Sequence, residues 1–254
     1  MYRFLIKPKW LLFHLLIVLA MLAMVSLGLW QLRRLHDRRD FNDTVRARTE
    51  FTVVPLDELV PAGAVVDVGP IEYRPVGITG TYVADLRYEL SVVRDDITGR
   101  DLYGVLQLAD GTVVVVDRGW LPAATPSPTL PEGEVQLTGR LREPDTGGTG
   151  QTVDTGSEPV PIFRVDVNAI AADAGAEPRA MFVERITAEP DEPQEMTAVP
   201  FPDLGEGPHL GYAVQWFLFT VCVFAGWGFA VARKVGELND PEAVRRVDPD
   251  APVF

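Results

Sequence analysis

A histidine with aromatic neighbours stands where the second long apolar stretch of the chain begins. His209 directly precedes the apolar run Leu210 to Ala232. On a helix, His209 would share one broad face with Tyr212 and Trp216. A neutral imidazole of this kind can ligate a metal ion, and aromatic rings can stack on a flat ligand.

The first long apolar stretch, Trp10 to Leu32, ends in a complementary set of side chains. Trp30 lies at its last turn, and Arg33 and Arg34 follow directly. If the two edges met, they would combine an aromatic slot, an imidazole ligand and cations for carboxylates. That combination suits a haem: His209 would ligate the iron, the aromatic rings would stack on the macrocycle, and Arg33 or Arg34 would pair with a propionate.

A simpler interpretation explains the same residues as anchors at a membrane surface. Aromatic side chains gather at the edges of membrane-spanning helices, and His209 would reach into the same interface. Gln31 and the two arginines would then bind lipid phosphate. Spacing alone favours this interpretation over haem binding.

Both apolar stretches are expected to be transmembrane helices, spanning residues 10–32 and 210–232. Neither contains Asp, Glu, Lys or Arg. Each would form a helix of about 35 Å, which is enough to cross a bilayer with some tilt. The first run is too long for a typical signal-peptide core, so we expect it to be retained.

The distribution of basic residues predicts that both termini are cytoplasmic. Arg233 and Lys234 directly follow the second run, and Lys7 and Lys9 precede the first. By the positive-inside rule, residues 1–9 and 233–254 lie in the cytoplasm and residues 33–209 form an extracytoplasmic region. An arginine cluster after the first run opposes this rule, which suggests a separate role for it; its members are Arg33, Arg34, Arg38, Arg39, Arg46 and Arg48.

The region between the two apolar runs reads as an α+β domain built on an antiparallel β-sheet with one or two short helices. Strand-like runs flank Asp110-Gly111, which is a strong hairpin signal. Val113 to Val116 is apolar on both faces and is predicted to be a central, buried strand. Further strands are expected within residues 73–82, 88–93, 103–108, 135–141 and 181–186.

Turn and capping residues complete this outline. Asp166 is expected to cap a short helix that runs through Ala174 and ends at Gly175. A charged hairpin tip is expected around Thr98-Gly99. Residues 145–156 form a Gly/Thr-rich loop, and residues 189–207, rich in proline and acid, form a linker back to the second apolar run.

Composition argues against several functional classes. The net charge of −13 disfavours binding to nucleic acid, because an acidic surface repels phosphate. The single cysteine, Cys222, excludes an intramolecular disulfide. None of the three histidines lies between Phe51 and Pro208, so a histidine-based catalytic triad or zinc site is unavailable there. We therefore expect a protein without enzymatic turnover.

Six short motifs, in order along nearly the whole chain, resemble the surfeit locus (Surf-one) family of cytochrome oxidase assembly proteins. The matching segments are Gly28-Leu29-Trp30-Gln31-Leu32-Arg33, Tyr73-Arg74-Pro75-Val76, Thr79-Gly80-Thr81-Tyr82, Val116-Asp117-Arg118-Gly119-Trp120-Leu121-Pro122, Gly139-Arg140-Leu141 and His209-Leu210-Gly211-Tyr212-Ala213-Val214-Gln215-Trp216-Phe217. Two residues depart from the family pattern: Pro208 stands where many relatives have asparagine, and Thr220 where a small apolar residue is common.

The resemblance implies a role in building haem–copper cytochrome c oxidase in the bacterial plasma membrane. It implies transient binding of haem a through His209, and delivery or insertion of haem a into oxidase subunit one. Its implied partners are subunit one, the haem a synthase and a bc-type complex in a supercomplex. An alternative is an accessory subunit that stays on the mature oxidase or supercomplex and binds no haem.

The motif containing Arg118 and Trp120 allows two interpretations. These residues would form a docking patch for the membrane or the oxidase. Alternatively, Arg118 would pair with a carboxylate of the domain and Trp120 would pack beneath a loop. The sequence leaves both open.

Overall fold

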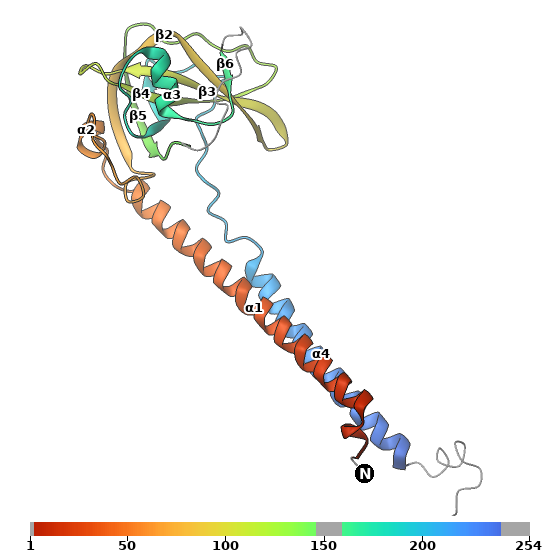
Figure 1. Ribbon diagram of the computed structural model, residues 1–254. Helices are drawn as coiled ribbons and strands as arrows, with labels where there is room; N and C mark the ends of the chain where they lie inside the picture. The colour runs from red at the N-terminus through yellow and green to blue at the C-terminus, as the bar shows by residue number, and fades with distance from the viewer. Residues whose placement is uncertain (1–2, 146–158, 240–254) are drawn as a thin grey trace, which may run out of the picture. The chain divides into compact units, whose positions relative to one another are not determined.

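The computed structural model describes residues 3–145 and 159–239, and its elements are labelled in Figure 1. The chain divides into two compact units, Met1–Asn42 with Leu204–Phe254, and Asp43–Asp203. The first unit holds most of one long helix and the whole of the other, and the second holds the end of the first helix and the sheet. This gives a mixed α+β protein with an apolar helix near each end.

A 3₁₀ turn (η1, Arg3–Ile6) precedes helix α1 (Pro8–Thr49), and helix α4 (His209–Asn239) follows the sheet domain. Both helices are long and apolar enough to cross a membrane. Helix α1 continues well past residue 32, where the first apolar run ends. No glycine or proline interrupts it there, and the ion pair Arg34–Asp37 and the side-chain contact His36–Asp40 support the added turns.

The two helices run antiparallel and meet along one stripe of each. Gln31 contacts His209 near one end, and His14 contacts Trp227 near the other. Between them, Gly28 leaves space for a ring, since a Cβ added there would lie 2.8 Å from Phe217. The less exposed residues recur at steps of three and four, which is the spacing of a helix-pair seam. They are His14, Ile17, Met21, Met24, Gly28, Gln31, Leu35, Arg38 and Asn42 on α1, and His209, Ala213, Trp216, Thr220, Val223, Trp227 and Ala230 on α4.

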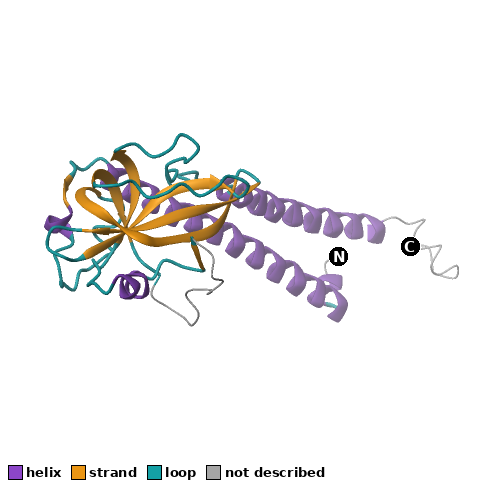
Figure 2. Ribbon diagram, turned by 90° about the horizontal axis from the view of Figure 1, so that it is seen from above, coloured by secondary structure: helices purple, strands orange, loops and turns teal. Residues whose placement is uncertain are grey.

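The second unit is a seven-stranded mixed sheet, drawn in orange in Figure 2. Strands β2, β3, β4, β7 and β5 pair in that order, and β5 pairs back to β2, so the sheet closes into a barrel. The short strands β1 and β6 add to β2. The strands are β1 (Val54–Pro55), β2 (Pro75–Arg94), β3 (Ile97–Gln107), β4 (Val113–Pro122), β5 (Glu134–Arg142), β6 (Val160–Ile162) and β7 (Phe182–Glu189).

The expectation of an antiparallel sheet is only partly right. The pairings β1–β2, β2–β6 and β4–β7 are parallel, and the others are antiparallel. Strand β7 follows β5 only after the chain has passed through β6 and helix α3 (Val167–Ala174). Such a crossover lets β7 run parallel to β4, which a tight hairpin does not permit. The expected short helices are α3 and the single turn α2 (Leu56–Leu59).

The predicted central strand is confirmed and explains how the core is layered. Val113 to Val116 are all buried in β4. Val114 and Val116 pack into one hydrophobic cluster, whereas Val113 and Val115 pack into a second that includes residues of α3. A strand buried on both faces carries no alternation of apolar and polar residues, as the sequence shows.

The predicted turns and caps are confirmed at two places, and one predicted hairpin tip is wrong. Gly111 has a positive φ of 85° in the β3–β4 turn, and Asp166 caps α3 by accepting from the backbone N–H groups of Asn168 and Ala169. The β2–β3 tip, however, lies at Asp95-Asp96, both with positive φ, rather than at Thr98-Gly99. A β-hairpin of two residues needs positive φ at both, and aspartate tolerates it.

Residues 189–207 were predicted to be a linker, and much of this segment is held against the barrel. Thr197 and Trp120 form an antiparallel bridge, with N···O distances of 2.8 and 3.0 Å. The Arg140 guanidinium donates to the carbonyls of Val199 and Pro200 at 2.8 and 2.7 Å. The predicted Gly/Thr-rich loop lies almost wholly outside the described residues.

Candidate functional site

His209 and Gln31 form a polar layer at one end of the apolar seam between the helices. The Nδ1 atom of His209 lies 2.9 Å from the Oε1 atom of Gln31. His209 is the first residue of α4, immediately after Pro208, and Gln31 lies on the seam of α1. The contact therefore joins two residues that are 178 positions apart in the chain.

This contact assigns the proton on the His209 ring. A carboxamide oxygen only accepts hydrogen bonds, so Nδ1 carries the hydrogen and donates it. The Nε2 atom then has a free lone pair, and it has no hydrogen-bond partner among the described residues. Metal-binding histidines are commonly held this way, with one ring N–H donated to a carbonyl or carboxylate and the other nitrogen facing the metal.

The residue before Pro208 lies beside the Nε2 edge of the imidazole. Gly207 has a positive φ of 68°, a conformation that glycine adopts readily. A Cβ added at Gly207 would lie 3.5 Å from Nε2 of His209 and 3.4 Å from its Cδ2 atom. Both distances are ordinary van der Waals contacts, so the positive φ, rather than a lack of space, favours glycine at this position.

The structure brings only some of the other predicted haem-binding residues to this layer. Trp216 lies on the seam, two turns along α4, and is partly buried. Tyr212 and Trp30 are about half exposed, at 49% and 50%, and lie beside the seam. Arg33 and Arg34 are exposed, and Arg34 lies 3.9 Å from Asp37.

The helical positions of these residues show which of them share one side of the pair. Arg34 follows Gln31 by three residues, and Tyr212 follows His209 by three, so each is rotated by about 60° from the seam. In an antiparallel pair, two such rotations fall on the same flank. Arg34 and Tyr212 therefore flank the His209 layer together, whereas Arg33 lies on the far side of α1.

A second polar layer occurs at the other end of the seam, and its chemistry differs. The indole Nε1–H of Trp227 donates to Nδ1 of His14 at 3.0 Å. In the neutral imidazole the hydrogen then sits on Nε2, which becomes a donor rather than a metal ligand. Of the two histidines on this seam, only His209 presents a free nitrogen lone pair.

The two residues predicted either to dock a partner or to pack internally are both buried. Arg118 is 1% exposed and forms a two-pronged ion pair with Glu192, with N···O distances of 2.8 and 2.6 Å. Trp120 is 8% exposed, and Gly99 packs against its ring. This arrangement matches the interpretation in which both side chains pair and pack within the domain. We therefore propose no docking role for them.

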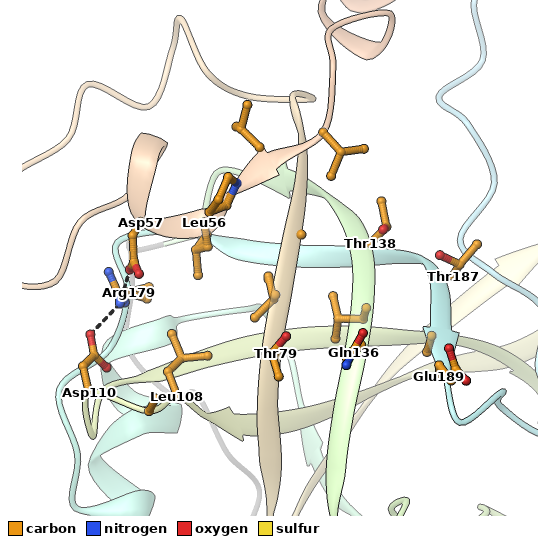
Figure 3. A pocket seen from close by; sticks show the side chains of 18 residues that line it. Leu56, Asp57, Thr79, Leu108, Asp110, Gln136, Thr138, Arg179, Thr187 and Glu189 are labelled. Atoms are coloured by element: carbon orange, nitrogen blue, oxygen red, sulfur yellow. Dashed lines mark hydrogen bonds and ion pairs between the residues drawn. The ribbon is translucent and has the colours of Figure 1, made fainter.

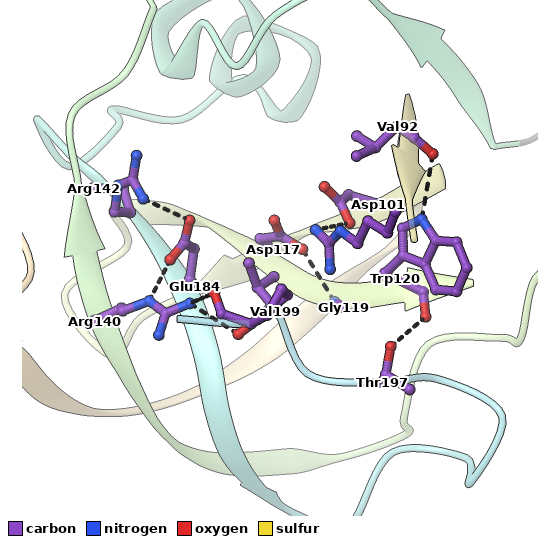
Figure 4. A network of polar contacts seen from close by, with 12 residues as sticks. Val92, Asp101, Asp117, Gly119, Trp120, Arg140, Arg142, Glu184, Thr197 and Val199 are labelled. Atoms are coloured by element: carbon purple, nitrogen blue, oxygen red, sulfur yellow. Dashed lines mark hydrogen bonds and ion pairs between the residues drawn. The ribbon is translucent and has the colours of Figure 1, made fainter. Parts of the chain in front are cut away.

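Inside the barrel wall, three carboxylates are spread across neighbouring strands (Figure 4). Glu184 accepts from both Arg140 and Arg142, and Asp101 pairs with Arg94 at 2.6 Å. Asp117 is fully enclosed and accepts from the Gly119 N–H at 3.1 Å. Burial, together with the charges of Asp101 and Glu184, raises the pKa of Asp117 well above its usual value. This network ties strands together, and no group of metal-binding side chains occurs among the described residues.

A groove of about 840 Å³ lies on the outer face of the barrel, beside α2 (Figure 3). Arg179 is one of its lining residues and is 1% exposed. Its guanidinium pairs with Asp57 at 2.5 Å and with Asp110 at 2.6 Å, so its charge is already neutralised. The lining contains no histidine, cysteine or serine, and we place no site there.

Sequence reasoning gave Gln31 no role beside His209, although a signal was present. Gly28, Gln31 and Leu35 continue the three–four spacing that begins at His14. A glutamine in such a seam must find a polar partner on the opposite helix, because an unpaired amide is costly in an apolar setting. His209 is the residue that meets it.

Comparison with known proteins relates the sequence to one family. The sequence model of the SURF1 family matches residues 18–221, a range that includes both Gln31 and His209. Uncharacterized SURF1-like proteins of Mycobacterium bovis and Mycobacterium tuberculosis are each 29% identical over 236 residues, covering 89% of this chain and 84% of each relative. A SURF1-like protein of Caenorhabditis elegans is 24% identical over 236 residues, covering 80% of this chain and 68% of that protein. The chain therefore belongs to the SURF1 family, whose members are known generally as oxidase assembly factors.

Proposed function

We propose that the protein assists the assembly of haem–copper cytochrome c oxidase by holding haem a transiently at His209, before its insertion into subunit one. The observation that carries the proposal is the hydrogen bond from His209 Nδ1 to Gln31 Oε1, 2.9 Å long, which leaves Nε2 as a free ligand. Family membership supports the link to the oxidase, and the geometry of His209 supports the link to haem.

The residues around His209 have side chains whose chemistry suits a haem. His209 would supply one nitrogen ligand through Nε2, because its Nδ1–H is already donated to Gln31. Arg34, on the same flank as Tyr212, would pair with a propionate, while Tyr212 and Trp216 offer aromatic surface. When bound, the haem would supply an iron centre with an optical spectrum that reports its ligand.

Each residue has a distinct task in this proposal. Gln31 holds the imidazole in one tautomer, and His209 would ligate the haem iron through Nε2. Arg34 would orient the haem by its charge, and Arg33, on the far side of α1, would contact lipid phosphate instead. None of these roles requires a chemical reaction, so the protein would act as a carrier without turnover.

The proposal places α1 and α4 in the bacterial plasma membrane, with both termini cytoplasmic and the barrel outside. Two helices of sufficient length and apolarity support the membrane location. The proposed partners are oxidase subunit one and the haem a synthase, with the bc-type complex as a neighbour in a supercomplex. Reporter fusions at residue 254 and within the barrel test the orientation.

The test is complementation in a bacterium that lacks its own copy of this gene. We expect wild-type protein to restore the haem a absorbance of the membranes and oxidase activity, and His209→Ala to restore them at most in small part. His14→Ala is the matched control and should complement fully. Equal complementation by wild type and His209→Ala would contradict haem delivery. If the protein then copurified in fixed ratio with mature oxidase, the accessory-subunit alternative would replace the proposal.

A further inference from the structure

The short segment that leads into α4 is held to α1 at three consecutive residues. The Asn42 side-chain amide donates to the Leu204 carbonyl at 2.7 Å. Arg38 donates from Nε to the Gly205 carbonyl at 3.0 Å. The Arg39 guanidinium donates two hydrogen bonds to the Glu206 carboxylate, each 2.8 Å long.

These contacts come from about one turn of α1 and end three residues before His209. Arg38, Arg39 and Asn42 are spaced so that they face the same approaching chain. Because only Gly207 and Pro208 separate Glu206 from His209, fixing Glu206 limits where the imidazole can lie. Proline restricts the conformation of the residue before it, which limits the segment further.

The three contacts differ in strength. Asn42 is 2% exposed, and its Oδ1 atom has no partner among the described residues. Burying an amide whose oxygen accepts no hydrogen bond is unfavourable. We therefore assign the hydrogen bond from its NH₂ group to Leu204 a role in positioning the chain. Arg39 and Glu206 are about half exposed, at 50% and 49%, so their two-pronged pair is weaker in water but specific in geometry.

We propose that Asn42 and Arg39, assisted by Arg38, are positioning residues that hold His209 against Gln31. The inference rests on the proposed function, because the position of His209 matters for its use as a ligand. It also gives two members of the arginine cluster a role that the positive-inside rule does not predict. They bind the returning chain of the same protein.

The proposal is tested first without haem, by nitrogen-15 NMR of histidine-labelled full-length protein in detergent. The ring shifts report which nitrogen carries the hydrogen, and His209→Ala identifies the signal of His209. We expect the Nδ1–H form in wild type, and its loss in Asn42→Leu and Arg39→Glu. The charge exchange Arg39→Glu with Glu206→Arg should restore it. Arg46→Glu, which breaks an exposed pair with Asp43 on the same helix, is the matched control and should resemble wild type.

Haem titration of the same variants gives the second measurement. Loss of the buried Asn42 bond should raise the haem Kd about tenfold, and loss of the exposed Arg39 pair about threefold. The charge exchange should recover the wild-type Kd. A role confined to overall stability would change yield or melting but neither the tautomer nor the Kd of folded protein.

The outcomes separate this inference from the proposed function. Variants that keep both the Nδ1–H form and the wild-type Kd would overturn the positioning role. If wild type bound no haem, the haem proposal would fail, and the tautomer data alone would decide the positioning role. Loss of the Nδ1–H form in Arg39→Glu, and its recovery in the charge exchange, would then still support the positioning role.

Discussion

His209 donates its Nδ1–H to the carboxamide oxygen of Gln31, and the two residues close one end of the seam between α1 and α4. The contact determines which ring nitrogen keeps a free lone pair, namely Nε2. His14, at the other end, accepts from Trp227 and so has the opposite hydrogen arrangement. Two histidines on one seam thus have different chemistry because their partners differ.

Two substitutions of Gln31 should change two different properties of the bound haem, its affinity and its midpoint potential. Gln31→Leu removes the acceptor for Nδ1–H, so we expect a loss of about tenfold in haem affinity, typical for the removal of an outer-shell partner. Gln31→Glu offers a stronger acceptor, which makes the imidazole more basic and should lower the midpoint potential of the bound haem. Haem titration and potentiometry measure the two effects. An unchanged potential in Gln31→Glu would show that this contact does not tune the ligand.

Gly28 should tolerate a larger residue poorly, because the ring of Phe217 occupies the space beside it. Gly28→Leu is expected to weaken the pairing of the helices by about 1–3 kcal/mol, as overpacking does. Gly226→Leu is the matched control, since a Cβ added at Gly226 meets nothing within 4 Å. Thermal unfolding in detergent, followed by tryptophan fluorescence, compares the two. Equal destabilisation would argue against close packing at Gly28.

The buried pair of Arg118 and Glu192 should be costly to break from one side. Both side chains are almost fully enclosed, at 1% and 2% exposed. Arg118→Leu would leave a buried carboxylate without its partner, so we expect a loss of about 3–5 kcal/mol in the free energy of unfolding. The double variant Arg118→Leu with Glu192→Leu should recover most of it. Chemical denaturation checks this, and a double variant no better than the single one would refute the pairing.

Asp117 should make the domain less stable as pH rises. Its pKa in the folded protein is raised by burial and by nearby Asp101 and Glu184. The folded state therefore holds its proton more tightly than the unfolded state does, and stability is lost as pH rises from the unfolded pKa of about 4 through the folded pKa. Asp117→Asn should remove this loss, raising Tm at pH 7.5 but not near pH 4.

Asp110 supplies a control of opposite sign for the same experiment. Hydrogen bonds from Thr112 lower the pKa of Asp110. Its contribution to stability is therefore present above the unfolded pKa and lost as pH falls through the folded pKa. Asp110→Asn should reduce Tm at pH 7.5 and have little effect in acid. Parallel pH profiles for the two variants would contradict this assignment of the two carboxylates.

Much of the fold follows from local pattern. The Asp166 cap, the Asp110-Gly111 turn and the doubly apolar run Val113 to Val116 each specify their element through short-range chemistry. The parallel pairing of β4 with β7 could not be read this way. It depends on a crossover between strands that are distant in sequence, and periodicity carries no information on which strands become neighbours.

The candidate site was predicted only in part for the same reason. His209 stood out because a histidine at the edge of an apolar run is unusual. Gln31, Asn42 and Arg39 matter through contacts across more than 160 positions of sequence. Arg118 and Trp120 illustrate the converse, since a charged and aromatic motif near the end of a strand proves to be buried and internally paired.

The most direct test of the account is the optical spectrum of the protein purified in detergent from cells that make haem a. Reduced and oxidised spectra would be recorded for wild type, His209→Ala and His14→Ala, each normalised to folded protein. The account predicts a haem band near one per protein in wild type and His14→Ala, and its loss in His209→Ala. A folded wild-type protein without haem, or the same band in His209→Ala, would contradict it and indicate a scaffold that acts by contact with the oxidase.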